Sequence, residues 1–245
     1  MVSPVAGAVL VAHQPAYLPW CGYFSRLTDV DELVLLDHVQ FAERGWQHRN
    51  LVRGPDADHP VRLSVPIARR GRFGQPIREA ELAPGTTWAA AHWRTLTQTY
   101  AKAPYWQAHA GRLQEIYARP WTHLAPLATE LIRFLLDGFG LTVDLATSSE
   151  LRPAGARTAM LVELCRARAA STLRTGAGAL DYLDRELLAG AGIALEVATY
   201  THPAYGTERR GWRPGLSALD LLLHEGPDAG QILRAGARHE RSILR

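Results

Sequence analysis

Short apolar runs and helical spacing alternate at the start of the chain. Residues 8–12 form an apolar run with β-branched positions that ends at His13, and residues 32–36 form a second apolar run. Such runs predict buried strands that enter polar loops. Residues 20–27, which lie between them, predict one or two helical turns. Strand, helix and strand within about 30 residues are typical of a parallel βαβ unit.

The next segment predicts a β-hairpin. Residues 61–65 alternate weakly between apolar and polar positions, and residues 77–82 have the pattern of a second strand. The segment ARRGRFGQP between them is rich in arginine and glycine, which favours a mobile tip.

The middle of the chain changes to helical periodicity. Apolar residues recur at helical spacing over 88–100, 106–117 and 124–139, and prolines separate these three stretches. We therefore expect a helical section at about residues 87–140.

The last third returns to alternating strands and helices. The pattern predicts strands at 141–146, 171–174 and 193–199 and helices at 157–168 and 179–189. Ser217, just before an apolar run, predicts the N-cap of a closing helix. The prediction is an α/β fold, with a Rossmann-like, mostly parallel sheet and a helical middle insertion. We expect one domain over 1–245, with α/β halves at about 1–85 and 141–236 around the helical section.

Composition excludes several classes of protein. The chain has 245 residues, of which 47% are hydrophobic, so a disordered chain is excluded. Lys102 is the only lysine, and its sequence context suits neither a P-loop nor a Schiff-base enzyme. Two cysteines without a CxxC motif favour neither a disulfide framework nor a cysteine-rich zinc site, and the ten histidines show no ligand spacing, so no metal is assigned.

Charge and hydropathy limit the location and the partners. No apolar stretch approaches the ~20 residues that cross a bilayer, and the two cysteines suit a reducing compartment, so we expect a cytoplasmic protein with no membrane partner. The net charge of +3 suits acidic ligands such as nucleotides. An RNA-binding module that uses the basic tail at 238–245 stays open as an alternative.

The densest group of candidate residues directly follows the first predicted strand. Ligands of open α/β sheets gather beyond the carboxyl ends of the strands, so this loop is expected to face a cleft. Two prolines stiffen the loop, and Gly22 allows a close approach of the backbone. The alternative is an aromatic packing loop in which His13 is hydrogen-bonded and inert. The candidates here are His13, Gln14, Tyr17, Trp20 and Tyr23.

A second group follows the second predicted strand and mirrors the first. If the two strands are adjacent and parallel, both loops open at the same edge of the sheet and form one pocket. Arg49 is the strongest partner there for a carboxylate or phosphate, and the amides of Gln40 and Asn50 can donate and accept hydrogen bonds. A solvated surface loop is the alternative. The further candidates in this loop are Asp37, Phe41 and Trp46.

Two later loops add weaker candidates. The segment TGAGALDYLD, with Gly176 and Tyr182, places a glycine turn before a helix and can cradle an anion, although an ordinary turn fits equally well. His202 and Tyr205, in THPAY, follow the strand predicted at 193–199 and would reach the same edge.

Six ordered segments of this sequence resemble the WbqC-like family of bacterial polysaccharide and natural-product gene clusters, including those of O-antigen. They are HQPAYLPWCGYF, DHVQFAERGWQHRN, KAPYW, TGAGALDYLD, THPAY and LSALDLLLHEGP. The family carries a glutamine after the THPAY tyrosine, where this chain has Thr207. It also has asparagines where this chain has Ala16 and His48.

A more local resemblance concerns nucleotide-binding ligases. Their second strand closes with a VNPxQF-like segment, and DHVQF at residues 37–41 is similar to it. The motif HxGH of those enzymes has the spacing of Trp20 to Tyr23 here, without either histidine. This resemblance implies nucleotide or nucleotide-sugar binding at the carboxyl edge of the sheet.

The resemblance to the WbqC-like family implies transfer of glycine or a similar amino acid onto an amino sugar. We therefore predict an amide-forming transferase or ligase, with His13 as general base and Arg49 as the second catalytic residue. The acceptor would be a small-molecule amine or a nucleotide sugar, and the donor an activated amino acid. The cofactor stays open, because either ATP with Mg or an aminoacyl-tRNA could supply activation. A non-catalytic nucleotide-sugar binding or scaffold protein is the alternative.

Overall fold

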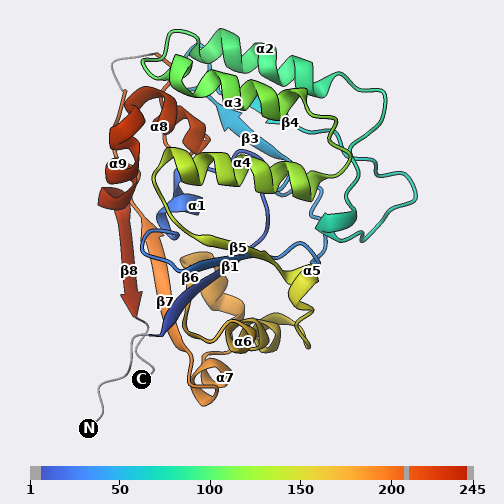
Figure 1. Ribbon diagram of the computed structural model, residues 1–245, viewed down its shortest axis with the longest axis vertical. Coiled ribbons are helices and arrows are strands. Elements are labelled where there is room, and N and C mark those ends of the chain that lie inside the picture. Colours follow the sequence, from blue (N-terminus) through green and yellow to red (C-terminus); the bar gives the residue numbers. More distant parts are fainter. Residues whose placement is uncertain (1–6, 207–209, 242–245) are drawn as a thin grey trace.

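The main feature of the computed structural model is a six-stranded sheet within the described residues, 7–206 and 210–241 (Figure 1). The strand order is β5-β2-β1-β6-β7-β8. The strands are β1 (Ala8–His13), β2 (Glu32–Leu35), β5 (Asp144–Thr147), β6 (Ala170–Gly176), β7 (Ala194–Tyr200) and β8 (Ala237–Arg241). The first five in this list pair in parallel, and β8 is antiparallel to β7. The predicted α/β fold with a mostly parallel sheet is confirmed.

Alternation along the strands gives the sheet two buried faces. Leu10 and Val34 belong to the core shared with α6 (Arg157–Ala167) and α7 (Arg185–Gly190). Their chain neighbours Val11 and Leu33 belong to the larger core on the opposite face. Successive side chains of a strand point to opposite faces, so strands covered on both sides are almost continuously apolar.

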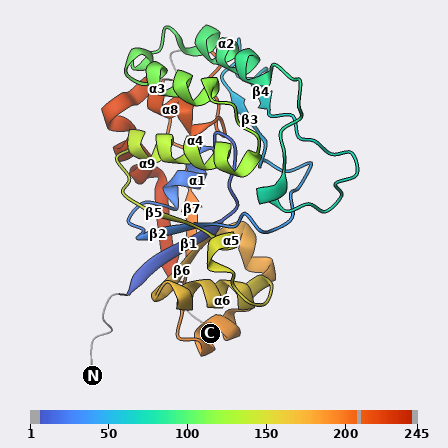
Figure 2. The same cartoon turned by 45° about the vertical axis from the view of Figure 1, so that its right-hand side comes forward.

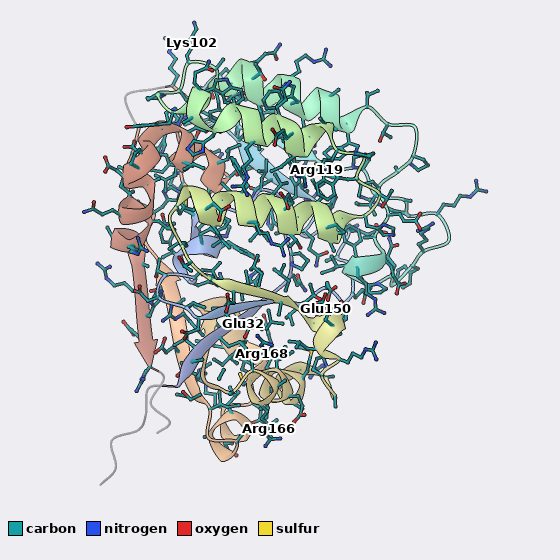
Figure 3. All side chains as sticks on the ribbon, viewed as in Figure 1. Glu32, Lys102, Arg119, Glu150, Arg166 and Arg168 are labelled. Carbon is teal, nitrogen blue, oxygen red and sulfur yellow. The ribbon has the colours of Figure 1, made fainter. Side chains whose placement is uncertain are left out.

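Four helices cover the larger-core face of the sheet, while α6 and α7 lie across the other face, as Figures 1 and 2 show. The four are α1 (Cys21–Ser25), α4 (Leu124–Gly138), α8 (Ala218–Glu225) and α9 (Ala229–Gly236). The short 3-10 helix η3 (Gly226–Asp228) connects α8 with α9. The carboxyl end of α6 is tied to the sheet by Arg168, whose Nε lies 2.7 Å from Glu32 Oε2 (Figure 3).

The helical middle section forms outer layers above this sheet. It consists of α2 (Trp88–Tyr100), α3 (Trp106–Ala118) and α4, close to the three predicted ranges. A separate two-stranded antiparallel sheet lies beside α2 and α3, and is formed by β3 (Arg49–Val52) and β4 (Val61–Ser64) (Figure 1). Lys102 lies at the outer end of this part, far from the main sheet (Figure 3).

The predicted hairpin of residues 61–65 with residues 77–82 is wrong for these ranges, although Ile67, just beyond the first range, forms an isolated antiparallel bridge with Leu82. β4 pairs with β3, whereas η1 (Ile77–Glu79) is a 3-10 helix. The backbone N–H groups of Ile77 and Arg78 donate to the carbonyls of Val39 and Asp37, at 2.9 and 2.8 Å. These donors are therefore engaged by the loop after β2 and are not available to a β4 ladder.

Two further expectations need correction. Residues 179–189 do not form one helix, because η2 (Ala177–Tyr182) ends before α7 begins. Asp184 starts α7 as its N-cap, accepting a hydrogen bond from Leu187 N at 2.9 Å. The tail beginning at Arg238 contributes β8, whose charged residues suit an exposed edge strand, and residues 242–245 lie outside the described part.

A buried ion pair joins the small sheet to α8. Ser217 is the N-cap of α8, as predicted, and its Oγ accepts from Leu219 N at 3.3 Å. Asp220, one turn into the helix, accepts two hydrogen bonds of 2.9 Å from the guanidinium of Arg53. These side chains are only 0% and 5% exposed, so each charge depends on the other for compensation.

Among the described residues, no helix has the length and apolar character needed to cross a bilayer.

We predict that Asp220→Ala lowers the free energy of unfolding by about 3–5 kcal/mol, because it leaves the Arg53 guanidinium buried without its carboxylate. The matched control is Asp137→Ala, since the Asp137–Arg112 pair is about half exposed on both sides. Its loss is expected to cost less than about 1 kcal/mol. Urea unfolding at pH 7 measures both, and equal costs would contradict the prediction.

Candidate functional site

At one point in the sheet, the chain leaves two neighbouring parallel strands, β1 and β6, toward opposite faces. After β1 the chain enters α1, which belongs to the larger core. After β6, the neighbour of β1, it enters η2 and α7 on the other face. Open α/β sheets bind ligands in the crevice that such a divergence opens at the carboxyl ends of the strands.

A cavity of about 830 Å³ lies at this position. This volume falls within the range of about 300–1,000 Å³ that is usual for small-molecule sites. Its walls come from the loops after β1 and β2, the C-cap of α1, the start of α6, and the segment from β6 through η2. The polar lining residues are His13, Gln14, Arg26, His38, Arg157, Thr158, Thr175 and Tyr182. We call this cavity the switch-point pocket.

The charge of the switch-point pocket has one sign. Two arginines, Arg26 and Arg157, and two histidines line it, and no aspartate or glutamate does so within the described chain. A cavity with cationic groups and no carboxylate attracts anions. The apolar part of its wall includes Leu36, Met160 and Leu161.

His13 ends β1 and lies partly buried in the wall of the pocket. Its Nδ1 lies 2.9 Å from the carbonyl oxygen of Gln14 and therefore donates, so Nε2 carries the lone pair. Within the described residues, Nε2 has no hydrogen-bond partner. Burial, and secondly the charge of Arg26, lowers the pKa of His13 to about 3. The imidazole is therefore neutral at pH 7.

Arg26 follows α1 and forms the wall next to His13. Its Nε donates to the carbonyl oxygen of Gly22 at 3.3 Å. The guanidinium lies so close to Gly176 that a Cβ there would stand 3.1 Å from Nη2. No carboxylate of the described residues lies within 4 Å of Arg26, and burial lowers the pKa of its guanidinium. Glycine at position 176 thus allows an arginine without a carboxylate partner to lie against the end of β6.

His38 is held by a short hydrogen-bonded chain. Ser148 Oγ donates to Asp37 Oδ1 at 3.0 Å and accepts from His38 Nδ1 at 2.5 Å. Asp37 also accepts from the backbone N–H and hydroxyl of Ser149, at 2.9 and 2.6 Å, in the first turn of α5 (Ser148–Leu151). Asp37 is therefore satisfied by α5 and positions His38, instead of lining the pocket itself.

The start of α6 supplies backbone donors to the same cavity. Gly155 to Thr158 line the pocket, and the helix has neither a side-chain N-cap nor an acidic residue in its first turn. Gly155 and Arg157 have φ values of +78° and +52°. The positive φ of Arg157 is costly for a residue other than glycine, and such conformations concentrate at binding sites.

Four of the residues predicted from sequence line the switch-point pocket: His13, Gln14, Gly176 and Tyr182. Tyr23 lies next to it, with its ring edge-on to that of His13 at 4.6 Å between centroids. Gln14 is oriented by Gln47, whose Nε2 donates to Gln14 Oε1 at 2.8 Å.

Tyr17 does not line the pocket but is fully buried in the larger core. Its hydroxyl bonds to His92 Nδ1 of α2 at 2.8 Å and to the hydroxyl of Tyr117 of α3. Tyr17 thereby attaches the loop after β1 to the helical layer.

Most of the loop after β2 turns away from the pocket. Only Leu36, His38 and Val39 at its start line the cavity, so the two loops share less of a pocket than the sequence predicts. Arg49 begins β3, where its Nε donates to Gly45 O at 3.0 Å and its guanidinium lies over the exposed Trp46. The other candidates in this loop, also outside the cavity, are the exposed Gln40 and the buried Phe41 and Asn50.

Three predicted residues meet instead in an aromatic cluster at the end of β7. Tyr200 contacts Trp20 and His202, and Trp212 contacts His202 and Tyr205. The Tyr200 and Tyr205 hydroxyls, His202 Nε2 and Trp212 Nε1 are buried without a hydrogen-bond partner in the described structure. Each such atom costs about 1–3 kcal/mol unless water or a ligand satisfies it, so this cluster has unused capacity for hydrogen bonding.

Comparison with known proteins agrees with the motifs that meet at these two places. A profile of the WbqC-like protein family matches residues 14–232. The chain belongs to this family. It is also 32% identical over 225 residues to the uncharacterized protein Rv1507c of Mycobacterium tuberculosis, with 90% of this chain and 95% of that protein covered. No solved structure matches the chain significantly.

The WbqC-like motifs divide between the two places in the fold. HQPAY and TGAGALDYLD contribute to the switch-point pocket, whereas THPAY belongs to the aromatic cluster. Thr207, where the family has glutamine, lies outside the described residues. Sequence reasoning missed Arg26, His38, Arg157 and Trp212. His38 stands inside a recognised motif, but no local signal marks Arg26 or Arg157.

The described part of the chain contains no preformed metal-binding site. No group of three or more histidine, cysteine, aspartate or glutamate side chains lies together in a way that could hold an ion. Both cysteines are buried, and burial raises the pKa of the Cys21 and Cys165 thiols to about 12.

We predict an acid-sensitive stability that depends on His13. Its pKa is about 3 in the folded protein and about 6.5 when unfolded, so the unfolded state binds more protons between these values. The contribution of neutral His13 is complete above pH 6.5 and is lost as the pH falls toward 3, with a slope of at most about 1.4 kcal/mol per pH unit.

Urea unfolding of the wild type and of His13→Asn at several pH values between 7 and 4 tests this prediction. The asparagine amide can replace Nδ1 as the donor to Gln14 O but does not titrate. The variant should lose less stability on acidification than the wild type. Parallel stability curves would show that His13 titrates normally in the folded protein.

Proposed function

We propose that this WbqC-like protein is an amide-forming transferase or ligase that places an activated amino acid on the amine of a sugar or another small metabolite. The observation that carries the proposal is the neutral His13 with an unused Nε2 in an anion-attracting pocket at the switch point of the sheet. General bases need a lone pair within reach of the substrate proton.

The proposed reaction requires the transfer of one proton from the attacking amine to the leaving group. The amine nitrogen attacks the carbonyl carbon of the activated amino acid, and a C–N bond forms as charge develops on the carbonyl oxygen. His13 Nε2 accepts the proton that the nitrogen loses. The bond from the carbonyl carbon to its leaving group then breaks, and the proton passes to the leaving group. The cationic lining of the pocket supports the developing negative charge.

The positions of His38 and Arg157 suit supporting roles. His38 has its Nδ1 fixed by Ser148, and its Nε2 has no partner within the described residues, so it can orient a substrate hydroxyl or amine. Arg157 and the first turn of α6 can hold a carboxylate or phosphate. Arg49, which lies outside this cavity, has no assigned step in the proposal.

Product formation tests the proposal directly. Purified protein is incubated with a nucleotide-linked amino sugar that has a free amine and with glycine, either with ATP and magnesium or as glycyl-tRNA. Mass spectrometry detects addition of one glycyl residue. We expect His13→Asn to reduce the turnover rate by about 10²- to 10⁴-fold.

The matched control is His59→Asn, because His59 is an exposed histidine that does not line the pocket. It should retain wild-type turnover. A folded His13→Asn protein with full activity would eliminate His13 as the base. Tight binding of the nucleotide sugar without product in either donor arm would instead favour a non-catalytic binding protein.

A further inference from the structure

Arg26 has an unusual environment for a cation in this molecule. Exposed arginines of the chain commonly pair with glutamate, as Arg72 does with Glu81 at 2.7 Å and Arg166 with Glu163 at 2.9 Å. Arg26 is more buried than these, yet within the described structure the only hydrogen bond of its guanidinium goes to the carbonyl of Gly22. A partly buried guanidinium without a counter-charge is costly, and an arriving anion would offset that cost.

The surroundings of Arg26 provide a second, independent feature for an anion. The first turn of α6, with no side-chain cap and no acidic residue, lines the same cavity. The first N–H groups of a helix have no partner within the helix, and this turn and Arg157 line a cavity that has no carboxylate in its described lining. Backbone donors at a helix N-terminus together with a bidentate arginine are a common arrangement for phosphate.

The remainder of the pocket fits the other parts of a nucleotide-linked molecule. Leu36, Met160 and Leu161 form an apolar wall, and Tyr182 at the rim is 66% exposed and offers an aromatic face. A base or sugar ring can pack on such surfaces while phosphates contact the cations. The cavity of about 830 Å³ is large enough for such a ligand.

We propose that Arg26 and the first turn of α6 bind the phosphates of a nucleoside diphosphate-linked substrate, and that this negative charge enables His13 to accept a proton. The inference rests on the proposed function, because it names the substrate class of the same pocket. It also answers a difficulty in that function, since the ligand-free His13 is a very weak base.

The coupling follows from which groups surround His13. Tyr23 of α1 packs against the His13 ring, and the charge of Arg26, just after α1, acts on it. The other titratable groups that line the same pocket are His38 from the loop after β2, Arg157 from α6 and Tyr182 from η2. No carboxylate of the described chain lines this pocket, so only the hydrogen bond to the Gln14 carbonyl favours a charged imidazole, and burial with the charge of Arg26 outweighs it. Phosphates placed on Arg26 would offset its repulsion and attract the imidazolium, which raises the pKa of His13 from about 3.

Calorimetric titration with UDP-glucose, GDP-mannose and ADP-glucose tests the inference without requiring turnover. The pyrophosphate diesters of these probes stay ionised between pH 5 and 8, so any proton taken up belongs to the protein. Heats measured at pH 5 to 6 in two phosphate-free buffers of different ionisation enthalpy give the number of protons taken up. We expect at least one probe to bind with proton uptake and its parent nucleoside to bind much more weakly.

Variants separate the two parts of the inference. Arg26→Ala should weaken the best probe by about 10- to 100-fold, as loss of a charged hydrogen bond predicts. Arg26→Lys should lose less affinity because it keeps the charge. The matched control Arg62→Ala removes an exposed arginine of β4 that does not line the pocket, and should bind as the wild type does. His13→Asn should still bind but take up no proton.

Each result decides one part. Failure of all three nucleotides to bind, or unchanged affinity in folded Arg26→Ala, would overturn the phosphate site whatever the transferase assay shows. Binding without proton uptake by the wild type, or undiminished uptake in His13→Asn, would overturn the coupling to His13. Binding with the expected uptake but without glycyl transfer would support the inference and count against the proposed reaction alone.

Discussion

The parallel pairing of β1 with β2 on one side and with β6 on the other is the constraint on which the candidate site depends. This register brings the ends of β1 and β6 together although about 160 residues separate them in the chain. Because α1 covers one face and η2 with α7 the other, the backbone diverges there and leaves a cavity. Without this pairing, His13 and Gly176 would not line the same cavity.

The electrostatics of the site follow from the absence of carboxylates in its described lining. None of the segments that line the cavity contributes a carboxylate to it. Asp37 stands between the lining residues Leu36 and His38, but its carboxylate accepts hydrogen bonds from the first turn of α5. The result is a neutral imidazole beside a guanidinium for which the described residues provide no counter-ion. Such an arrangement costs stability in the empty protein and gives binding energy to an anion, which is the usual compromise at functional sites.

The helical section and small sheet act as a support for the loops. Tyr17 attaches the loop after β1 to α2 and α3, and Gln47 orients Gln14 from the loop after β2. Arg53 and Asp220 fix the small sheet to α8. These contacts are buried and polar, so they select one arrangement: an alternative packing would leave charged or hydroxyl groups without partners.

Periodicity and local chemistry were enough to predict the α/β class, the three middle helices, the N-cap at Ser217 and four residues of the pocket. These features depend on neighbours in sequence, such as apolar spacing and capping. The pairing of β4 with β3, the edge strand β8 and the break between η2 and α7 depended on competing partners elsewhere in the chain. The sequence also marked Arg49 as the anion-binding residue, whereas tertiary structure placed Arg26 in the pocket. An arginine carries the same chemistry at every position, and only the packing around it decides which one lacks a carboxylate.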